Sequence, residues 1–156
     1  MTASPSTPPA IFSRVLPSRL GEIEGLSQAL SDWLEEQGAP LRAIASISLM
    51  LDELFTNVVM HGYQGDGSGT VRVDAEVAHQ AVTVKLTDHA FAFNPLLAPE
   101  PDTSLDLDER GIGGLGVHFV RKMSDEIAYR RIETPDGAAN ELRFVKRFIP
   151  PPGPAS

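Results

Sequence analysis

The spacing of apolar residues changes along this chain from a helical period to a strand period, and this change limits the folds that it can adopt. Apolar side chains recur every three or four residues from 20 to 34 and again from 41 to 58. They then alternate with polar side chains from 71 to 77 and from 82 to 86. The first spacing is typical of amphipathic helices and the second of half-buried strands. The sequence therefore predicts two helices followed by an antiparallel hairpin with a tight turn near His79.

Three further strands and a third helix complete the expected elements. The strands are expected at 11–16, 127–132 and 141–148, and the helix over about 114–124. This order predicts an α/β (α+β) fold, a two-layer sandwich in which a mostly antiparallel mixed sheet carries three helices on one face. The helix residues expected to pack on the sheet are Leu20, Ile23, Leu26, Leu30, Trp33, Leu34, Leu41, Ile44, Ile47, Leu51, Phe55, Val58, Val117, Val120 and Met123.

Composition excludes several functional classes. The net charge of −8 argues against nucleic acid or anionic membrane as the main partner, and the absence of cysteine excludes disulfides and thiolate metal sites. The four histidines lack the spacing of metal ligands, which argues against a transition-metal site built from histidines. No serine lies in a G-x-S-x-G elbow, so a Ser/His/Asp hydrolase is unsupported. The sequence shows neither a signal peptide nor an apolar run of about 18 residues, so a cytoplasmic protein is expected. One domain is expected over 10–149, between a disordered tail at 1–9 and a proline-rich tail at 150–156.

A polar pair interrupts the second expected helix, in the segment that ends at Tyr63. Glu53 and Asn57 are four residues apart and share a helix face, which His61 continues. An amide oxygen suits Mg²⁺ bound to phosphates, and a carboxylate one turn away can accept a proton from an attacking hydroxyl. The same pattern also fits a solvated polar face.

Asp88 ends the second strand of the hairpin and opens the segment Asp88–Pro95. The alternation of Val84 and Leu86 before it directs its side chain out of the sheet toward a pocket. A carboxylate only accepts hydrogen bonds, so it can pair with the amino group of adenine but would oppose O6 of guanine. An aspartate that simply starts a turn is the alternative.

The glycine-rich segment Gly111–Gly116 fits the pattern G-x-G-x-x-G, but its context excludes two common phosphate loops. An acidic stretch rather than an apolar strand precedes it, and Val117 and His118 follow where a Walker loop needs lysine and serine or threonine. Glycines at a helix N-terminus can still expose backbone N–H groups to phosphate, or can serve tight packing. The long acidic segment 94–110 before them is expected to be a lid.

Taken together, three segments resemble the N, G1 and G2 boxes of the GHKL ATPase/kinase superfamily, whose ATP-binding domain is the Bergerat fold. These segments are Glu53–Tyr63, Asp88–Pro95 and Gly111–Gly116, in that order. The likeness covers about residues 10–148. It is greatest to anti-sigma-factor serine/threonine kinases of the RsbW and SpoIIAB type, because 113–127 and 140–148 are also similar to that group.

This resemblance implies an ATP- and Mg²⁺-dependent kinase that phosphorylates a serine or threonine of a STAS-domain anti-anti-sigma factor. It also implies partner switching with a sigma factor, and usually a homodimer. Glu53 would be the catalytic base, Asn57 the Mg²⁺ ligand and Asp88 the acceptor for the adenine amino group. The other residues implied to line the nucleotide are Ala90, Arg110, Gly111, Gly113, Gly114, Leu115 and Gly116.

Two positions depart from the pattern of this group. Ala90 stands where glycine is usual and adds a Cβ where the chain approaches the base, and Asn94 stands where aspartate is frequent. Glu53 and Asn57 are retained, so a kinase is expected. The alternatives are a non-catalytic nucleotide-binding or partner-sequestering module, which Ala90 favours, and a structural dimer of the same fold.

Overall fold

The computed structural model describes residues 10–62, 69–97 and 114–148. The elements follow in the order β1 (Ala10–Pro17), α1 (Ile23–Glu36), α2 (Leu41–Asn57), β2 (Thr70–Ala78), β3 (Ala81–Asp88), α3 (Gly114–Met123), β4 (Glu126–Thr134) and β5 (Gly137–Arg147). Three short turns accompany them, namely the 3-10 turns Leu20–Glu22 and Pro95–Leu97 and the π-helical turn Val58–Gly62. This order confirms the predicted succession of strands and helices.

Several expectations concern segments outside the described residues. These are the two tails, the loop at 63–68 and the part of the expected lid from 98 to 110. The described residues at the start of the expected lid contain a 3-10 turn at Pro95–Leu97, which the sequence analysis did not anticipate.

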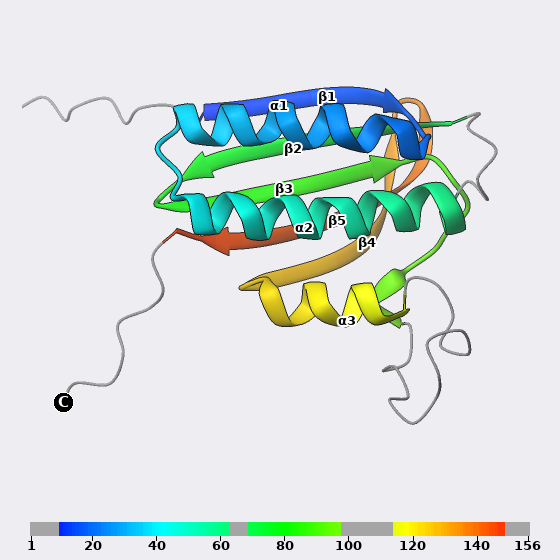
Figure 1. Ribbon diagram of the computed structural model, residues 1–156. Helices are drawn as coiled ribbons and strands as arrows, with labels where there is room; N and C mark the ends of the chain where they lie inside the picture. Colours follow the sequence, from blue (N-terminus) through cyan, green and yellow to red (C-terminus); the bar gives the residue numbers. More distant parts are fainter. Residues whose placement is uncertain (1–9, 63–68, 98–113, 149–156) are drawn as a thin grey trace, which may run out of the picture.

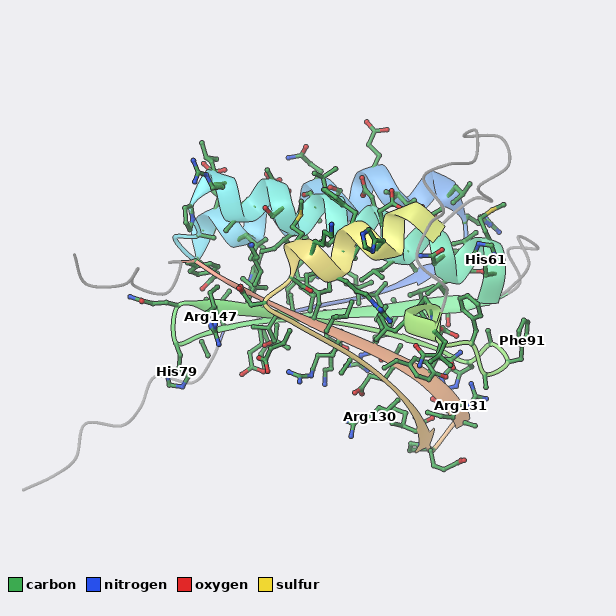
Figure 2. The ribbon with its side chains drawn as sticks, turned by 90° about the horizontal axis from the view of Figure 1, so that it is seen from below. His61, His79, Phe91, Arg130, Arg131 and Arg147 are labelled. Carbon is green, nitrogen blue, oxygen red and sulfur yellow. The ribbon has the colours of Figure 1, made fainter. Side chains whose placement is uncertain are left out.

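The five strands form one sheet in the order β1-β2-β3-β5-β4. Each neighbouring pair of these strands is antiparallel, so the expected parallel component of a mixed sheet is not found among the described strands. The three helices lie on one face of the sheet, and the view along the sheet leaves the opposite face uncovered by helices (Figures 1 and 2). The predicted two-layer α+β sandwich is therefore confirmed.

The tight turn of the β2–β3 hairpin falls where the sequence placed it. His79 and Gln80 have positive φ angles of 53° and 61°. Left-handed backbone at both central positions is typical of the type I′ hairpin turn, whose twist matches that of the flanking strands. The turn fixes the register that pairs Val71 with Asp88 at the far end of the hairpin.

The core lies between α1, α2 and the helix-facing side of the sheet. Phe55 of α2 and Phe144 of β5 are among its largest fully buried side chains. Most residues expected to face the sheet do so, but Leu20 and Leu41 are 48% and 78% exposed. Leu20 belongs to the 3-10 turn ahead of α1, and Leu41 is the first residue of α2, where the helix has not yet reached the sheet.

The apolar character of α2 follows from its place in this core. By length and composition the stretch Leu41–His61, with a mean hydropathy of 1.5, is apolar enough to cross a membrane. Half of that stretch is buried inside the protein, where it contacts both α1 and α3. A core helix of a two-layer sandwich must be apolar on the faces that it buries, so its composition needs no lipid to explain it.

Candidate functional site

Asp88 reaches the interior because it continues the alternation of β3. Val84 and Leu86 point toward the helices and are buried, and Asp88 takes the same side two residues later. Its side chain is almost fully buried, with 5% of its surface exposed. A carboxylate in such a place requires hydrogen-bond partners or a ligand. The prediction that Asp88 points into a pocket is consistent with this position.

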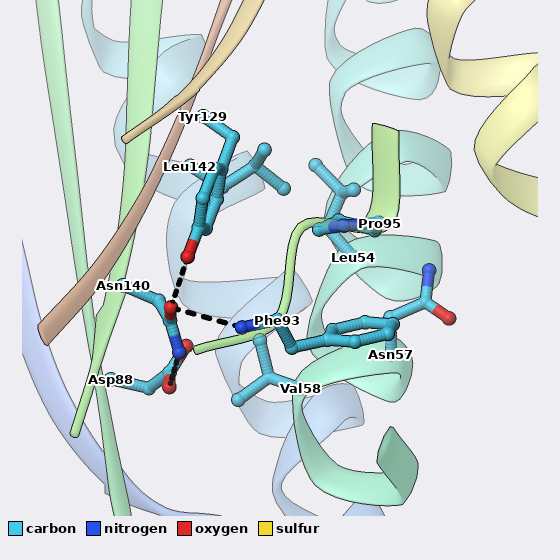
Figure 3. A pocket seen from close by; sticks show the side chains of 9 residues that line it. All are labelled: Leu54, Asn57, Val58, Asp88, Phe93, Pro95, Tyr129, Asn140 and Leu142. Carbon is cyan, nitrogen blue, oxygen red and sulfur yellow. Dashed lines mark hydrogen bonds between the residues drawn. The ribbon is translucent and has the colours of Figure 1, made fainter. Parts of the chain in front are cut away.

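A small cavity lies between α2, the end of β3, the strands β4 and β5, and the segment after β3 (Figure 3). Its lining residues are Leu54, Asn57, Val58, Asp88, Phe93, Pro95, Tyr129, Asn140 and Leu142. The cavity encloses about 20 Å³, which is enough for a water molecule but not for a nucleotide base. It is mostly apolar, with Asn57, Asp88 and Asn140 as polar groups on opposite walls.

Asn57 lines the cavity from the last turn of α2. The residue is 4% exposed, and its Nδ2 is buried without a hydrogen-bond partner among the described residues. A buried amide left with an unpaired end costs free energy unless a ligand or ordered water satisfies it. The structure thus brings Asn57 and Asp88, predicted from separate segments, to one cavity.

Glu53 does not share this cavity. It lies one helical turn before Asn57 on α2, is partly exposed, and is not among the cavity's lining residues. Its neighbour Asp52 lines a separate groove beside α1, where burial and, to a smaller extent, the charge of Glu53 raise the pKa of Asp52. Of the three polar residues implied at one nucleotide site, Asn57 and Asp88 line the same cavity and Glu53 does not.

The helix geometry changes directly after Asn57. Val58–Gly62 form a π-helical turn, and π turns inside α-helices occur often at functional sites. The ring of His61 in this turn stacks on that of Phe93, with centroids 5.7 Å apart and planes at 28°. His61 therefore contacts the wall of the cavity through Phe93.

The carboxylate of Asp88 is held by two donors. Its Oδ1 accepts from Nδ2 of Asn140 at 2.9 Å and from the backbone N–H of Ala90 at 3.1 Å. Burial raises the pKa of Asp88, while the bonds from Asn140 and Ala90 and the positive charge of Arg131 lower it in part. No described residue donates a hydrogen bond to the other oxygen, Oδ2, which leaves it available to a ligand.

Ala90 fits this site without backbone strain. It is buried, and the described non-glycine residues with positive φ are His79 and Gln80 alone. A positive φ favours glycine, and φ is not positive at Ala90. Its N–H instead caps the Asp88 carboxylate. The departure from the usual glycine therefore does not distort the chain.

The glycine segment is only partly within the described residues. Gly114, Leu115 and Gly116 form the first residues of α3, as predicted for glycines at a helix start. Arg110, Gly111 and Gly113 lie outside the described residues.

Sequence reasoning did not identify the apolar lining residues of the cavity as site residues, nor three polar residues near Asp88, namely Tyr129, Arg131 and Asn140. Asn140 occupies a core position of β5, where Leu142 and Phe144 alternate with it toward the helices. A polar residue in an apolar alternation was a signal that could have identified it. No such pattern marks Tyr129 and Arg131 in the sequence. Their hydrogen bonds to Asn140 depend on the pairing of β4 with β5.

Comparison with known proteins places this geometry in a family. The sequence profile of the histidine kinase-like ATPase domain matches residues 16–146, which is most of the chain.

Two curated relatives and one solved structure show the extent of the likeness. The serine-protein kinase RsbW of Listeria monocytogenes is 23% identical over 103 residues, covering 64% of this chain and 66% of that protein. The anti-sigma F factor of Clostridium botulinum is 22% identical over 127 residues, covering 77% and 82%. The chain thus spans just under two thirds of the RsbW relative. A structure of the SiaB–SiaC complex from Pseudomonas aeruginosa matches with a TM-score of 0.59 at 18% identity, covering 86% of this chain and 89% of that one, and it supports the fold.

Proposed function

The chain belongs to the histidine kinase-like ATPase family, and from this premise we propose that it is an ATP-dependent serine/threonine protein kinase. Its substrate would be a STAS-domain anti-sigma antagonist, and the chain would sequester a sigma factor when that antagonist is phosphorylated. The names of the RsbW and anti-sigma F relatives support this proposal. The observation that carries it is the meeting of Asn57 and Asp88 at one cavity between α2 and the sheet.

Asp88 would select adenine. Its Oδ2 would accept the amino group of the base, while Leu54, Val58 and Leu142 provide apolar surface for the ring. Guanine presents a carbonyl oxygen at the equivalent position, and two acceptors facing each other in a buried site repel. The site therefore fits ATP better than GTP.

The donor set also fits a magnesium-bound triphosphate. Asn57 would hold Mg²⁺ through its amide oxygen, and its unpaired Nδ2 shows that this side chain lacks a full set of partners in the protein. The side-chain oxygen and nitrogen exchange places when the amide turns over, so either can face the ligand. When bound, Mg²⁺ supplies positive charge that offsets the charge of the phosphates.

Glu53 would act as the base. Glu53 lies one turn before Asn57 and is partly exposed. In this proposal its carboxylate would lie beside the phosphates, where a protein hydroxyl could approach from solvent. The serine or threonine proton would pass to a carboxylate oxygen of Glu53 as the hydroxyl oxygen bonds to the γ-phosphorus. The bond from that phosphorus to the β,γ-bridging oxygen would break, and ADP would leave. Glu53 can then contribute to transfer without contributing to adenine binding.

A partner-sequestering module without kinase activity is the second candidate. The small volume of the cavity favours it, because the side chain of Phe93 extends toward Asn57 across the space that a base would need (Figure 3). In that case nucleotide would bind weakly, and the domain would act through protein contacts alone.

Incubation of the purified protein with radiolabelled ATP, Mg²⁺ and candidate STAS-domain proteins separates the two functions. The kinase proposal requires label on a serine or threonine of the partner, and loss of that label in Glu53→Gln with ATP binding retained. Complex formation without label, or label that survives Glu53→Gln, contradicts the proposed kinase mechanism. Asp52→Asn, which alters the adjacent carboxylate facing α1, serves as the matched control.

A further inference from the structure

The side-chain amide of Asn140 is the centre of a hydrogen-bond network around Asp88. Its Nδ2 donates to Oδ1 of Asp88 at 2.9 Å and to the carbonyl of Phe91 at 3.0 Å, with the carbonyl of Ala90 at 3.4 Å. Its Oδ1 accepts from Nη1 of Arg131 at 3.1 Å and from the backbone N–H of Phe93 at 3.3 Å.

The hydroxyl of Tyr129 donates to the same Oδ1. One buried amide thus connects the end of β3 and the segment that follows it to β4 (Figure 3). An asparagine amide has two N–H donors and two acceptor sites, so all of its capacity is used.

These contacts allow one orientation of the amide. In the observed orientation the N–H groups face a carboxylate and carbonyls, and the oxygen faces N–H and O–H donors. A half turn would set the oxygen against the carboxylate of Asp88 and the N–H groups against the guanidinium of Arg131. Both contacts are repulsive, so the donors on β4 determine that Asn140 donates to Asp88.

The register of the sheet brings the two donors to this place. Arg131 lies opposite Asn140, and Tyr129 is two residues away on the same side of β4. Arg131 also donates to the carbonyl of Ala90 at 2.8 Å, so it contacts both the amide and the backbone after Asp88. The adjacent Arg130 lies on the opposite side of the strand, where it forms an ion pair with Glu141 at 2.7 Å (Figure 2).

We propose that Tyr129 and Arg131 are positioning residues for nucleotide selection, which act through Asn140 to hold the Asp88 carboxylate ionised with only its Oδ2 free. This inference deepens the proposed function, since it rests on Asp88 as the adenine acceptor. With Oδ1 already occupied by Asn140 and Ala90, the site offers one acceptor in one direction. A protonated carboxyl group would present an O–H donor as readily as an acceptor, and a carboxylate free to rotate would not hold an acceptor in one direction. Either change would weaken the discrimination between adenine and guanine.

The charged groups that face Asp88 make this role measurable by titration. They are Arg131 from β4 and His89 from the end of its own strand, and the neutral donors are Asn140 and the N–H of Ala90. Tyr129→Phe removes a single hydroxyl that contacts Asn140 rather than Asp88. A rise in the pKa of Asp88 in this variant would therefore report transmission through the amide.

The test compares Tyr129→Phe and Arg131→Met with wild type, and Arg130→Met is the matched control on the outer side of β4. The Asp88 carboxyl is titrated by ¹³C NMR without nucleotide, and affinities for ATP and GTP with Mg²⁺ are measured by calorimetry. In Tyr129→Phe and Arg131→Met we expect a higher Asp88 pKa and about three- to tenfold weaker ATP binding, which is the usual effect of one buried hydrogen bond. GTP binding should change less, so the ATP-to-GTP preference should fall.

The outcomes separate this inference from the kinase proposal. Wild-type values for the Asp88 titration and the nucleotide preference in a folded Tyr129→Phe variant would overturn it. So would a wild-type protein that binds ATP and GTP equally or binds neither. If wild type binds ATP selectively and the variants respond as expected, but no label reaches a protein partner, that result would support the positioning role of Tyr129 and Arg131 and contradict the kinase reaction.

Discussion

Asp88 and Asn140 lie directly opposite each other on β3 and β5, and Nδ2 of Asn140 donates to Oδ1 of Asp88 at 2.9 Å. The pair comes from segments 52 residues apart in sequence. The pair forms because β3 is hydrogen-bonded to β5. In the sheet, β5 lies between the β2–β3 hairpin and the edge strand β4. The polar end of an otherwise apolar interior is thus built by sheet topology.

Replacement of Glu53 by glutamine should reduce phosphoryl transfer without reducing ATP affinity. The amide cannot accept the hydroxyl proton, and loss of a general base typically lowers the rate by about 10²- to 10⁴-fold. ATP affinity should stay within twofold because Glu53 does not line the cavity beside Asp88, a margin of roughly 0.4 kcal/mol. Single-turnover labelling of the partner and calorimetry of ATP binding measure the two effects separately. A matching loss of ATP affinity would assign Glu53 to binding instead.

Removal of the Phe93 ring should strengthen nucleotide binding. The cavity is too small for a base as it stands, and Phe93 occupies its side next to Asn57 while stacking on His61. A base must displace this ring and break the stack, at a cost of about 0.5–1.5 kcal/mol for the aromatic pair. Phe93→Ala should therefore bind ATP several-fold more tightly, by roughly the factor that this energy gives.

Phe91→Ala is the control for that experiment, because Phe91 lies two residues away and is exposed. It should leave ATP affinity unchanged. Weaker ATP binding in Phe93→Ala would show that the ring supports the base rather than occupying its place.

The pH dependence of stability should change when Asp88 is replaced by asparagine. Burial raises the folded-state pKa of Asp88 above its ordinary value of 3.8, so folding shifts this group toward its protonated form relative to the unfolded chain. Such a group contributes stability below the unfolded pKa, and this contribution is lost as pH rises through the folded pKa. Asparagine keeps the acceptor for Asn140 and carries no charge. Asp88→Asn should therefore gain stability relative to wild type as pH is raised.

Urea unfolding of both proteins at several values between about pH 4 and pH 7 measures this difference. The difference in free energy of unfolding should grow in favour of the variant across that interval. A difference that is independent of pH would mean that Asp88 titrates at its ordinary value in the folded protein.

The parts of the fold that depend on local pattern could be predicted from the sequence. The helical spacing ahead of the hairpin and the position of the turn at His79 are set by nearby residues, and the structure confirms both. The same is true of the helix that starts at Gly114. The exposed Leu20 and Leu41 were not predicted, because periodicity continues past the point at which a helix meets the sheet.

The parts of the site that depend on strand pairing could not be predicted in the same way. Asp88 and Asn57 are polar residues at the ends of apolar elements, so the sequence identifies both as candidate site residues. The contact of Arg131 with the carbonyl of Ala90 requires β4 to lie beside β5 in a defined register. A shift of that register by one residue would place Arg130 there instead, and no local pattern distinguishes the two arginines.

Calorimetric titration of ATP with Mg²⁺ into wild type and Asp88→Asn, side by side, tests the central claim most directly. The account predicts saturable binding of ATP by wild type, and about ten- to hundredfold weaker binding by the variant, as expected for loss of a hydrogen bond to a charged acceptor. GTP should gain relative to ATP in the variant, because asparagine can turn an N–H group toward O6 of guanine. Equal ATP affinity of the two proteins, or no binding by wild type at millimolar ATP, would contradict an adenine site at Asp88.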